Sequence, residues 1–232
     1  MDLYLNRRSL LAGLASGSAM MAAPALAVYT NDRVTEPGFA SAGARWLAQT
    51  FGETLSKVVA GTPFSKSLVC AIAYQETGYV WFTKLRHQMT PQELLRLLVL
   101  DNSSPRSVFP RDTAAFAADK RFGSLASEMV AASDASRQAR GIKPTGKLLY
   151  GYGLFQNDLQ NIEQNPEFWS EVVGTDAAGK AVHGIWGDIE KSAKYFLGEL
   201  TGKFEDNGRN HRLAVQRYNG RGPSSRIYVQ NV

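Results

Sequence analysis

Apolar residues recur at intervals of three and four along most of this chain, and this spacing limits its possible folds more than any other feature. Such patterns cover residues 46–59, 68–76, 113–140 and 188–204. Alternating apolar and polar residues, as in a half-buried strand, are nearly absent outside residues 147–152. We therefore expect a mainly α fold with little or no β structure.

Local signals predict where several helices begin. Thr62–Pro63 combines a cap with a proline at the first helical position. Thr90–Glu93 has the pattern of a capping box. Asp188 and Asn210 are N-cap residues ahead of further apolar patterns. Residues 101–112, which include two prolines, are expected to form a loop.

The first 27 residues have the order of a signal peptide, with basic, then apolar, then small residues. Arg7 and Arg8 precede the apolar stretch, and Ala25–Ala27 provides the small residues of a cleavage site. The paired arginines favour a twin-arginine signal over an ordinary secretory signal. The apolar stretch is shorter than the ~20 residues that span a bilayer. We therefore expect a periplasmic or secreted protein whose mature chain, residues 28–232, forms one domain.

The composition argues against several function classes. The chain has 26 basic and 21 acidic residues, an excess that favours an anionic polymer, but no dense basic run indicates nucleic acid. Cys70 is the only cysteine, so no internal disulfide can form, and its apolar surroundings predict a buried thiol. The three histidines lack partners at the spacing of a metal site or catalytic dyad. We therefore expect no metal and no cofactor.

Glu76 is the titratable residue whose position suggests chemistry. It follows the apolar stripe Val69–Ala73 at helical spacing, so we expect its carboxyl on the apolar side of a helix that ends near Gly78. Burial and the negative end of the helix dipole both raise the pKa of a carboxyl, as a general acid near neutral pH requires. The alternative is a helix-end glutamate that faces solvent or pairs with Lys84 or Arg86.

Three short segments at helix ends or in loops combine glycine with polar or aromatic residues: Gln75–Gly78 (QETG), Gly151–Gln156 (GYGLFQ) and Arg217–Pro223 (RYNGRGP). They resemble, in order, the Glu-Ser motif, the Gly-Leu-Met-Gln segment and the Ala-Tyr-Asn-Ala-Gly turn of lysozyme-like lytic transglycosylases. Threonine keeps the hydroxyl in the first, and phenylalanine replaces methionine in the second. The resemblance spans residues 64–223, but only these segments match closely.

The resemblance implies an α+β lysozyme-like fold with a catalytic helix ending at Glu76. It also implies a glycosidase that cleaves peptidoglycan glycan strands, with Glu76 as general acid/base and Tyr218 orienting it. A sugar groove needs aromatic faces and amide groups. The candidates for substrate binding are Thr77, Tyr152, Gln156, Tyr218 and Asn219. The alternative for the aromatic residues is core packing, which suits Phe155 and Trp169 better than the two tyrosines among glycines.

The chain departs from the family in the length of the segment between the first two motifs. The segment between Glu76 and Gly151 is much longer than in lytic transglycosylases. We interpret residues 84–146 as a helical insertion that forms a lid, a wall of the groove or a contact with a protein partner. This departure leaves the subfamily and the second catalytic element open.

Two reactions begin with proton transfer from Glu76 to the glycosidic oxygen. In hydrolysis a water attacks, and an inverting enzyme activates it with a second carboxylate. Goose-type lysozymes, which are muramidases, have an aspartate in a position similar to Asp158, although Asp158 could instead cap the helix starting at Leu159. In lytic transglycosylation the sugar's own 6-hydroxyl attacks, without a second carboxylate. A glycosidase acting on chitin-like polymers and a non-catalytic cell-wall-binding module are the competing functions.

Overall fold

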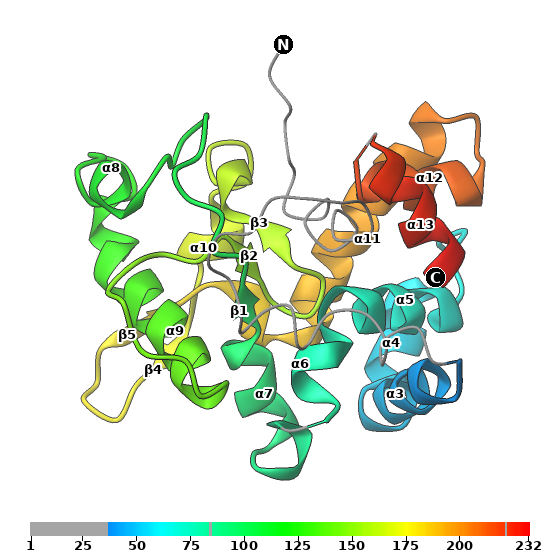
Figure 1. Cartoon of the computed structure of the whole chain (residues 1–232), viewed down its shortest axis with the longest axis horizontal. Coiled ribbons are helices and arrows are strands. Elements are labelled where there is room, and N and C mark those ends of the chain that lie inside the picture. Colours follow the sequence, from blue (N-terminus) through cyan, green and yellow to red (C-terminus); the bar gives the residue numbers. More distant parts are fainter. Residues whose placement is uncertain (1–36, 84, 221) are drawn as a thin grey trace, which may run out of the picture. The chain divides into compact units, whose positions relative to one another are not determined.

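The computed structural model describes residues 37–232, apart from residues 84 and 221. The expected signal peptide, residues 1–27, lies outside this range. Helices predominate among the described residues, and the strands are few and short (Figure 1). The prediction of a mainly α fold is therefore confirmed. None of the described helices combines the length and the apolar character needed to cross a bilayer.

The chain forms two compact units. Among the described residues, the terminal unit combines residues 37–79 with residues 196–232, and the central unit is residues 80–195. The expected insertion, residues 84–146, lies within the central unit, where its helices share one hydrophobic core with residues from 147–195.

The terminal unit is helical. Its helices are α3 (Pro37–Thr50), α4 (Gly52–Val59), α5 (Lys66–Ala73), the second part of α11 (Ile189–Asp206), α12 (His211–Tyr218) and α13 (Pro223–Asn231). Asn210 caps α12 as predicted, because its Oδ1 accepts the Leu213 N–H at 3.0 Å. The predicted cap at Thr62 is wrong. Ser65 caps α5 instead, and the Thr62 hydroxyl closes the preceding turn by donating to the Val59 carbonyl at 2.8 Å.

The central unit combines short helices with two small sheets. Its elements are α7 (Pro91–Leu97), β1 (Val99–Leu100), α8 (Thr113–Ala117), α9 (Ala126–Ala139), β2 (Gly151–Tyr152), β3 (Asn157–Asp158), α10 (Glu167–Ser170), β4 (Val172–Thr175), β5 (Ala181–His183) and the start of α11. The capping box at Thr90 is confirmed, because Thr90 and Glu93 each bond the other's backbone N–H. Asp188 accepts the Lys191 N–H at 3.0 Å, as expected of the residue before α11.

Antiparallel pairing in the order β1-β2-β3 places Tyr152 opposite both Val99 and Asn157. The β2 strand lies in the one segment where the sequence shows a strand signal. The hairpin of β4 and β5 was not predicted. The core beneath these elements is aromatic, with Phe116, Tyr152, Phe168, Trp169 and Trp186 all fully buried.

Candidate active site

A π-helical turn, Tyr74–Gly78, carries Glu76. A π turn inserts an extra residue into a helix, and such insertions occur frequently at functional sites. The preceding helix, α5, buries Val69, Ile72 and Ala73, and Glu76 continues this side with only 4% of its surface exposed. The expectation that Glu76 lies on the apolar side is confirmed, and the alternative of a solvent-facing glutamate is wrong.

The helical run does not end near Gly78 as expected. It continues from the π turn into α6 (Tyr79–Trp81), so Gly78 lies inside the run. Glu76 is therefore not in the last helical turn, so the predicted position of its carboxyl at the negative end of the helix dipole is wrong. The predicted burial of the Glu76 carboxyl is confirmed, because it depends on the packing of one side of the helix and not on where the helix ends. The alternative pairing with Lys84 involves a residue outside the described range.

Close packing around Tyr74 holds the π turn in place. Its ring lies against Gly43 on α3 and against Gly78 in the turn. A β-carbon at Gly43 would come within 2.2 Å of a ring atom, and one at Gly78 within 2.4 Å. The two glycines therefore make room for the ring. Burial raises the pKa of Tyr74 to about 12, so the phenol stays neutral.

Tyr228 is a direct partner of the Glu76 carboxylate. Its hydroxyl donates a hydrogen bond of 2.8 Å to Glu76 Oε1, and its ring is buried. The helix that carries it, α13, is tied to α12 by a 3.3 Å hydrogen bond from Gln216 Nε2 to Ser225 Oγ. Tyr228 was not predicted from the sequence. The available signals were Pro223 at a first helical position and the helical spacing of Ser225 and Tyr228.

The other predicted site residues of the terminal unit, Thr77, Tyr218 and Asn219, are all buried. The Thr77 hydroxyl donates to the Ala73 carbonyl at 3.0 Å. Tyr218 packs edge-on against Phe196, with ring centroids 5.1 Å apart. Asn219 ends α12, and the described residues provide no donor for its buried Oδ1. Because a buried acceptor without a donor is costly, a ligand N–H at this atom would be stabilising.

The segment Gly151–Gln156 contributes to the scaffold of the central unit. Tyr152 is fully buried in the core, where burial raises its pKa. Gln156 Nε2 donates to the carbonyls of Leu98, at 3.1 Å, and Gly153, at 2.9 Å. Tyr152 therefore packs in the core, which was the alternative for this residue, and the role of Gln156 in sugar binding stays a prediction. Strand pairing on both edges of β2 directs the tyrosine into the core, and the glutamine amide stabilises the turn that follows.

Asp158 is held from two directions. Its Oδ1 accepts the Gln160 N–H at 3.1 Å and caps the 3₁₀ helix Leu159–Asn161, so the capping interpretation is confirmed. Its Oδ2 lies 3.4 Å from the guanidinium of Arg106. Arg106 also pairs with Asp101 at 2.5 Å, and only 9% of its side chain is exposed. Asp158 therefore belongs to an ion-pair cluster, and its role in water activation stays a prediction.

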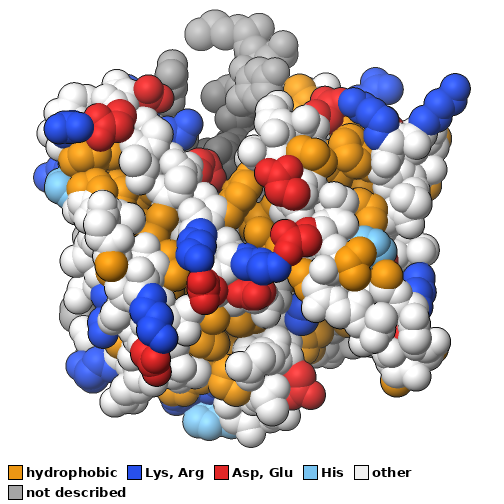
Figure 2. Space-filling view, turned by 180° about the vertical axis from the view of Figure 1, so that it is seen from behind, with side chains coloured by type: hydrophobic (Ala, Val, Ile, Leu, Met, Phe, Trp, Pro, Cys, Tyr) orange, Lys and Arg blue, Asp and Glu red, His pale blue; other side chains and the backbone are white. Residues whose placement is uncertain are grey.

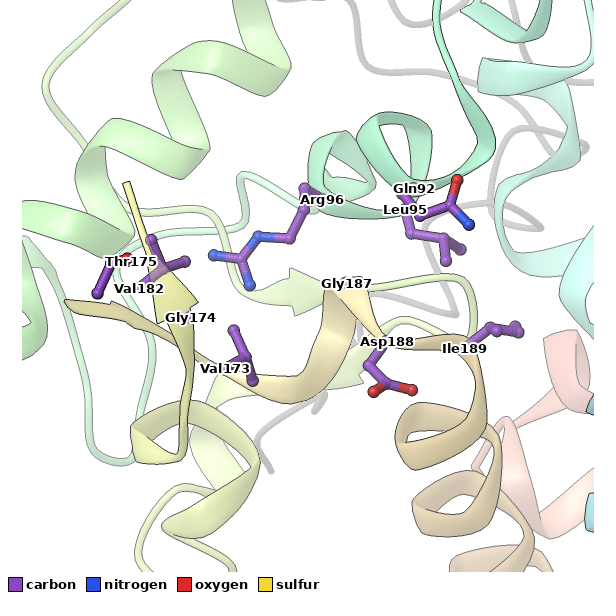
Figure 3. Close-up of a pocket in the computed structure, with 10 residues that line it drawn as sticks. All are labelled: Gln92, Leu95, Arg96, Val173, Gly174, Thr175, Val182, Gly187, Asp188 and Ile189. Atoms are coloured by element: carbon purple, nitrogen blue, oxygen red, sulfur yellow. The ribbon is translucent and has the colours of Figure 1, made fainter. Parts of the chain in front are cut away.

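The central unit also contains a cavity of about 530 Å³ (Figure 3). Arg96 extends from α7 toward the β4–β5 hairpin, where both Nη atoms donate to backbone carbonyls and the guanidinium stacks 4.2 Å over the Trp186 ring. Burial lowers the pKa of Arg96, and Glu128 opposes that shift. The cavity contains none of the predicted site residues. Its lining is Gln92, Leu95, Arg96, Val173, Gly174, Thr175, Val182, Gly187, Asp188 and Ile189.

Among the described residues, the remaining nucleophilic and metal-binding side chains do not gather into a second site. Cys70 is buried as predicted, and burial raises the pKa of its thiol to about 11. His183 contacts Glu128 at 2.7 Å, and His211 contacts the Pro63 carbonyl at 2.8 Å. Within the described part of the chain, no group of three or more His, Cys, Asp or Glu side chains is placed to hold a metal ion.

Comparison with known proteins yields no match to a protein family, to a curated protein or to a solved structure. The resemblance to lytic transglycosylases therefore depends on the three short segments, of which the first and third lie in the terminal unit and the second in the central unit.

Proposed function

We propose that this protein is an exported glycosidase that cleaves the bond between N-acetylmuramic acid and N-acetylglucosamine in peptidoglycan. Glu76 acts as its general acid and base. The observation that carries the proposal is the buried Glu76 carboxylate, set in a π turn and bonded by the Tyr228 hydroxyl at 2.8 Å. The order of the three motifs along the sequence supports it further.

The reaction begins when Glu76 gives its proton to the glycosidic oxygen. The bond between that oxygen and C1 of the muramic acid breaks, and positive charge develops at C1. In lytic transglycosylation the 6-hydroxyl of the same sugar then attacks C1, and its proton passes to Glu76. The products are a 1,6-anhydro end and a free 4-hydroxyl. The cycle balances without water and without a second carboxylate.

The surroundings of Asp158 favour this outcome over hydrolysis. One carboxylate oxygen caps a helix and the other faces Arg106, so both are engaged by the protein. A water-activating carboxylate needs an oxygen that can accept a proton from water. We therefore propose lytic transglycosylation as the main reaction, with hydrolysis as the alternative outcome.

Asn219 supplies a second part of the proposed site. Its buried Oδ1 has no donor among the described residues, and an acetamido N–H of either sugar is a donor of the right kind. This contact would orient the substrate without taking part in proton transfer.

Mass spectrometry of muropeptides released from purified sacculi tests the proposal. We expect anhydro ends from the unaltered protein, and a loss of roughly 10²- to 10⁴-fold in rate for Glu76→Gln with an unchanged melting temperature. Glu53→Gln, an exposed glutamate on α4, is the matched control and should cleave normally. Reducing ends would instead indicate hydrolysis.

Three other results would overturn parts of the proposal. Activity retained in Glu76→Gln would remove Glu76 from the mechanism. Equal cleavage of chitooligosaccharides would indicate a glycosidase of broader substrate class. Binding to sacculi without any release by the unaltered protein would indicate a non-catalytic wall-binding module.

A further inference from the structure

The last 26 residues of the sequence, 207–232, have an unusual charge pattern. They contain five arginines and no lysine, aspartate or glutamate. In the whole chain, basic residues only modestly outnumber acidic ones, 26 to 21. The positive charge is therefore concentrated in one segment and carried there by arginine alone.

Most of this segment folds into α12 and α13, which pack against each other in the terminal unit (orange and red in Figure 1). The helices have eight and nine residues, so each is only about 12–14 Å long. Their inner sides bury Val215 and Tyr228, among others. Their exposed residues include Arg212 with Leu213 on α12, and Arg226 with Ile227 on α13. We call these four residues the arginine face.

The arginines of this face lack the acidic partners that several other exposed basic residues have. Lys57 and Lys194 each pair with a glutamate four residues earlier. On the face of the molecule shown in Figure 2, several basic side chains lie directly beside acidic ones. Neither Arg212 nor Arg226 forms an ion pair with any residue that the structure describes. Their charge is thus available to an external anion.

Exposed aliphatic side chains accompany these arginines. Leu213 is 38% exposed and Ile227 is 45% exposed, and both are among the few large apolar side chains that are exposed in the described part of the chain. A hydrated polyanion would gain little from them. A lipid surface would use both kinds of side chain, since guanidinium groups bind phosphate through paired hydrogen bonds and aliphatic groups enter the boundary between headgroups and acyl chains.

We propose that the arginine face docks this protein peripherally onto a membrane rich in anionic phospholipid. Arg212 and Arg226 bind headgroup phosphates, and Leu213 and Ile227 enter the boundary of the acyl chains. Tyr228 lies on the inner side of the same helix as Arg226, so docking would hold the Glu76 site close to the membrane surface. The proposal does not depend on the glycosidase activity.

Sedimentation of the full chain with lipid vesicles tests this proposal. We expect binding to vesicles of phosphatidylglycerol and phosphatidylcholine, weak binding to pure phosphatidylcholine, and a decline as salt is raised. Each arginine near an anionic surface contributes roughly fivefold in affinity, so Arg212→Gln with Arg226→Gln should weaken binding roughly thirtyfold. Leu213→Ser with Ile227→Ser should weaken binding at every salt concentration.

The matched control is Lys57→Gln with Lys194→Gln, which removes the same charge from two exposed, ion-paired sites and should bind normally. All variants share residues 1–36, so any lipid binding by that segment cancels in the comparison. Equal loss in the control, or wild-type affinity in the arginine variant, would overturn the proposal.

A soluble anion provides the remaining test. Tighter binding to polyphosphate or to nucleic acid than to the vesicles, with no effect of the leucine and isoleucine changes, would replace the membrane with a soluble polyanion. Glu76→Gln should bind vesicles normally. Failure of glycan cleavage and failure of membrane docking are therefore distinguishable.

Discussion

Glu76 and Asp158 are carboxylates that lie in different compact units, each within or just after a glycine-containing motif, and the protein holds them by different means. Glu76 lies in a π turn of the terminal unit and accepts a hydrogen bond from the neutral hydroxyl of Tyr228. Asp158 lies in the central unit, where it caps a helix and faces the guanidinium of Arg106. The Tyr228 partner of Glu76 is uncharged, whereas the Arg106 partner of Asp158 is a permanent cation.

The nature of the partner decides which kind of chemistry each carboxylate can support. A tyrosine hydroxyl can donate to a carboxylate and can also accept from a protonated carboxyl, so Glu76 keeps this partner in both protonation states. A guanidinium can only donate and stays charged, so it stabilises only the ionised form. The Tyr228 contact suits a residue that loses and regains a proton, whereas the Arg106 contact suits a residue that holds structure.

The largest expected effect on stability comes from breaking the cluster around Asp158. Arg106→Gln leaves Asp101 and Asp158 without their cation, and removal of one partner from a buried ion pair costs about 3–5 kcal/mol. The free energy of unfolding, measured with urea, checks this. Arg121→Gln is the control, because Arg121 forms exposed pairs with Asp119 and Glu163 and its loss should change stability little. Equal effects in the two variants would contradict the structural role of Arg106.

Tyr228→Phe tests the role of the hydroxyl that bonds Glu76. The change removes one hydroxyl, so we expect the cleavage rate to fall roughly tenfold to a hundredfold. The limb of the pH–rate profile that Glu76 controls should also move to higher pH, because the hydroxyl bonds the charged carboxylate more strongly than the neutral carboxyl. Tyr150→Phe is the matched control, since the buried Tyr150 hydroxyl donates to the Arg111 carbonyl in the central unit and makes no contact with Glu76 that the structure describes. A lower rate with an unmoved pH profile would mean that Tyr228 only supports the fold.

Asp158→Asn tests whether Asp158, in addition to Glu76, affects which product the enzyme releases. Asparagine can still cap the 3₁₀ helix, but it loses its charge interaction with Arg106, so the free energy of unfolding should fall by about 1 kcal/mol. Glycan cleavage should continue, with anhydro ends in the muropeptides. The contrary result is that the unaltered protein releases reducing ends and the variant does not. This result would mean that Asp158 activates water.

The smallest effect concerns Asp134, a third carboxylate with a structural role. Burial opposes its ionisation, but the N–H groups of Thr145 and Gly146 and the guanidinium of Arg137 outweigh it and lower the pKa of Asp134. Asp134 therefore stabilises the protein above its unfolded pKa, and this stabilisation is lost as the pH falls through the lower folded value. Asp134→Asn should lower the melting temperature slightly at neutral pH and not in strong acid. A difference that persists in acid would contradict this charge-dependent role.

The sequence predicted features that depend on nearby residues. A cap or a capping box involves atoms only three residues apart, so the helix starts at Thr90 and Asn210 could be read directly. Helical spacing likewise predicted that Glu76 lies on a buried side. The failures were also local: the proline after Thr62 suggested a helix start, but the better-placed hydroxyl of Ser65 caps α5.

By itself, the sequence determined that this protein is mainly helical and that Glu76 is its most suggestive carboxyl. Only the tertiary structure decided which residues accompany each carboxylate. Tyr228 lies 152 positions from Glu76, and Arg106 lies 52 positions from Asp158. Strand pairing likewise directed Tyr152 into the core, although its neighbouring glycines suggested a ligand site. Local spacing cannot predict such contacts, because they depend on how complete elements pack once their apolar sides are buried.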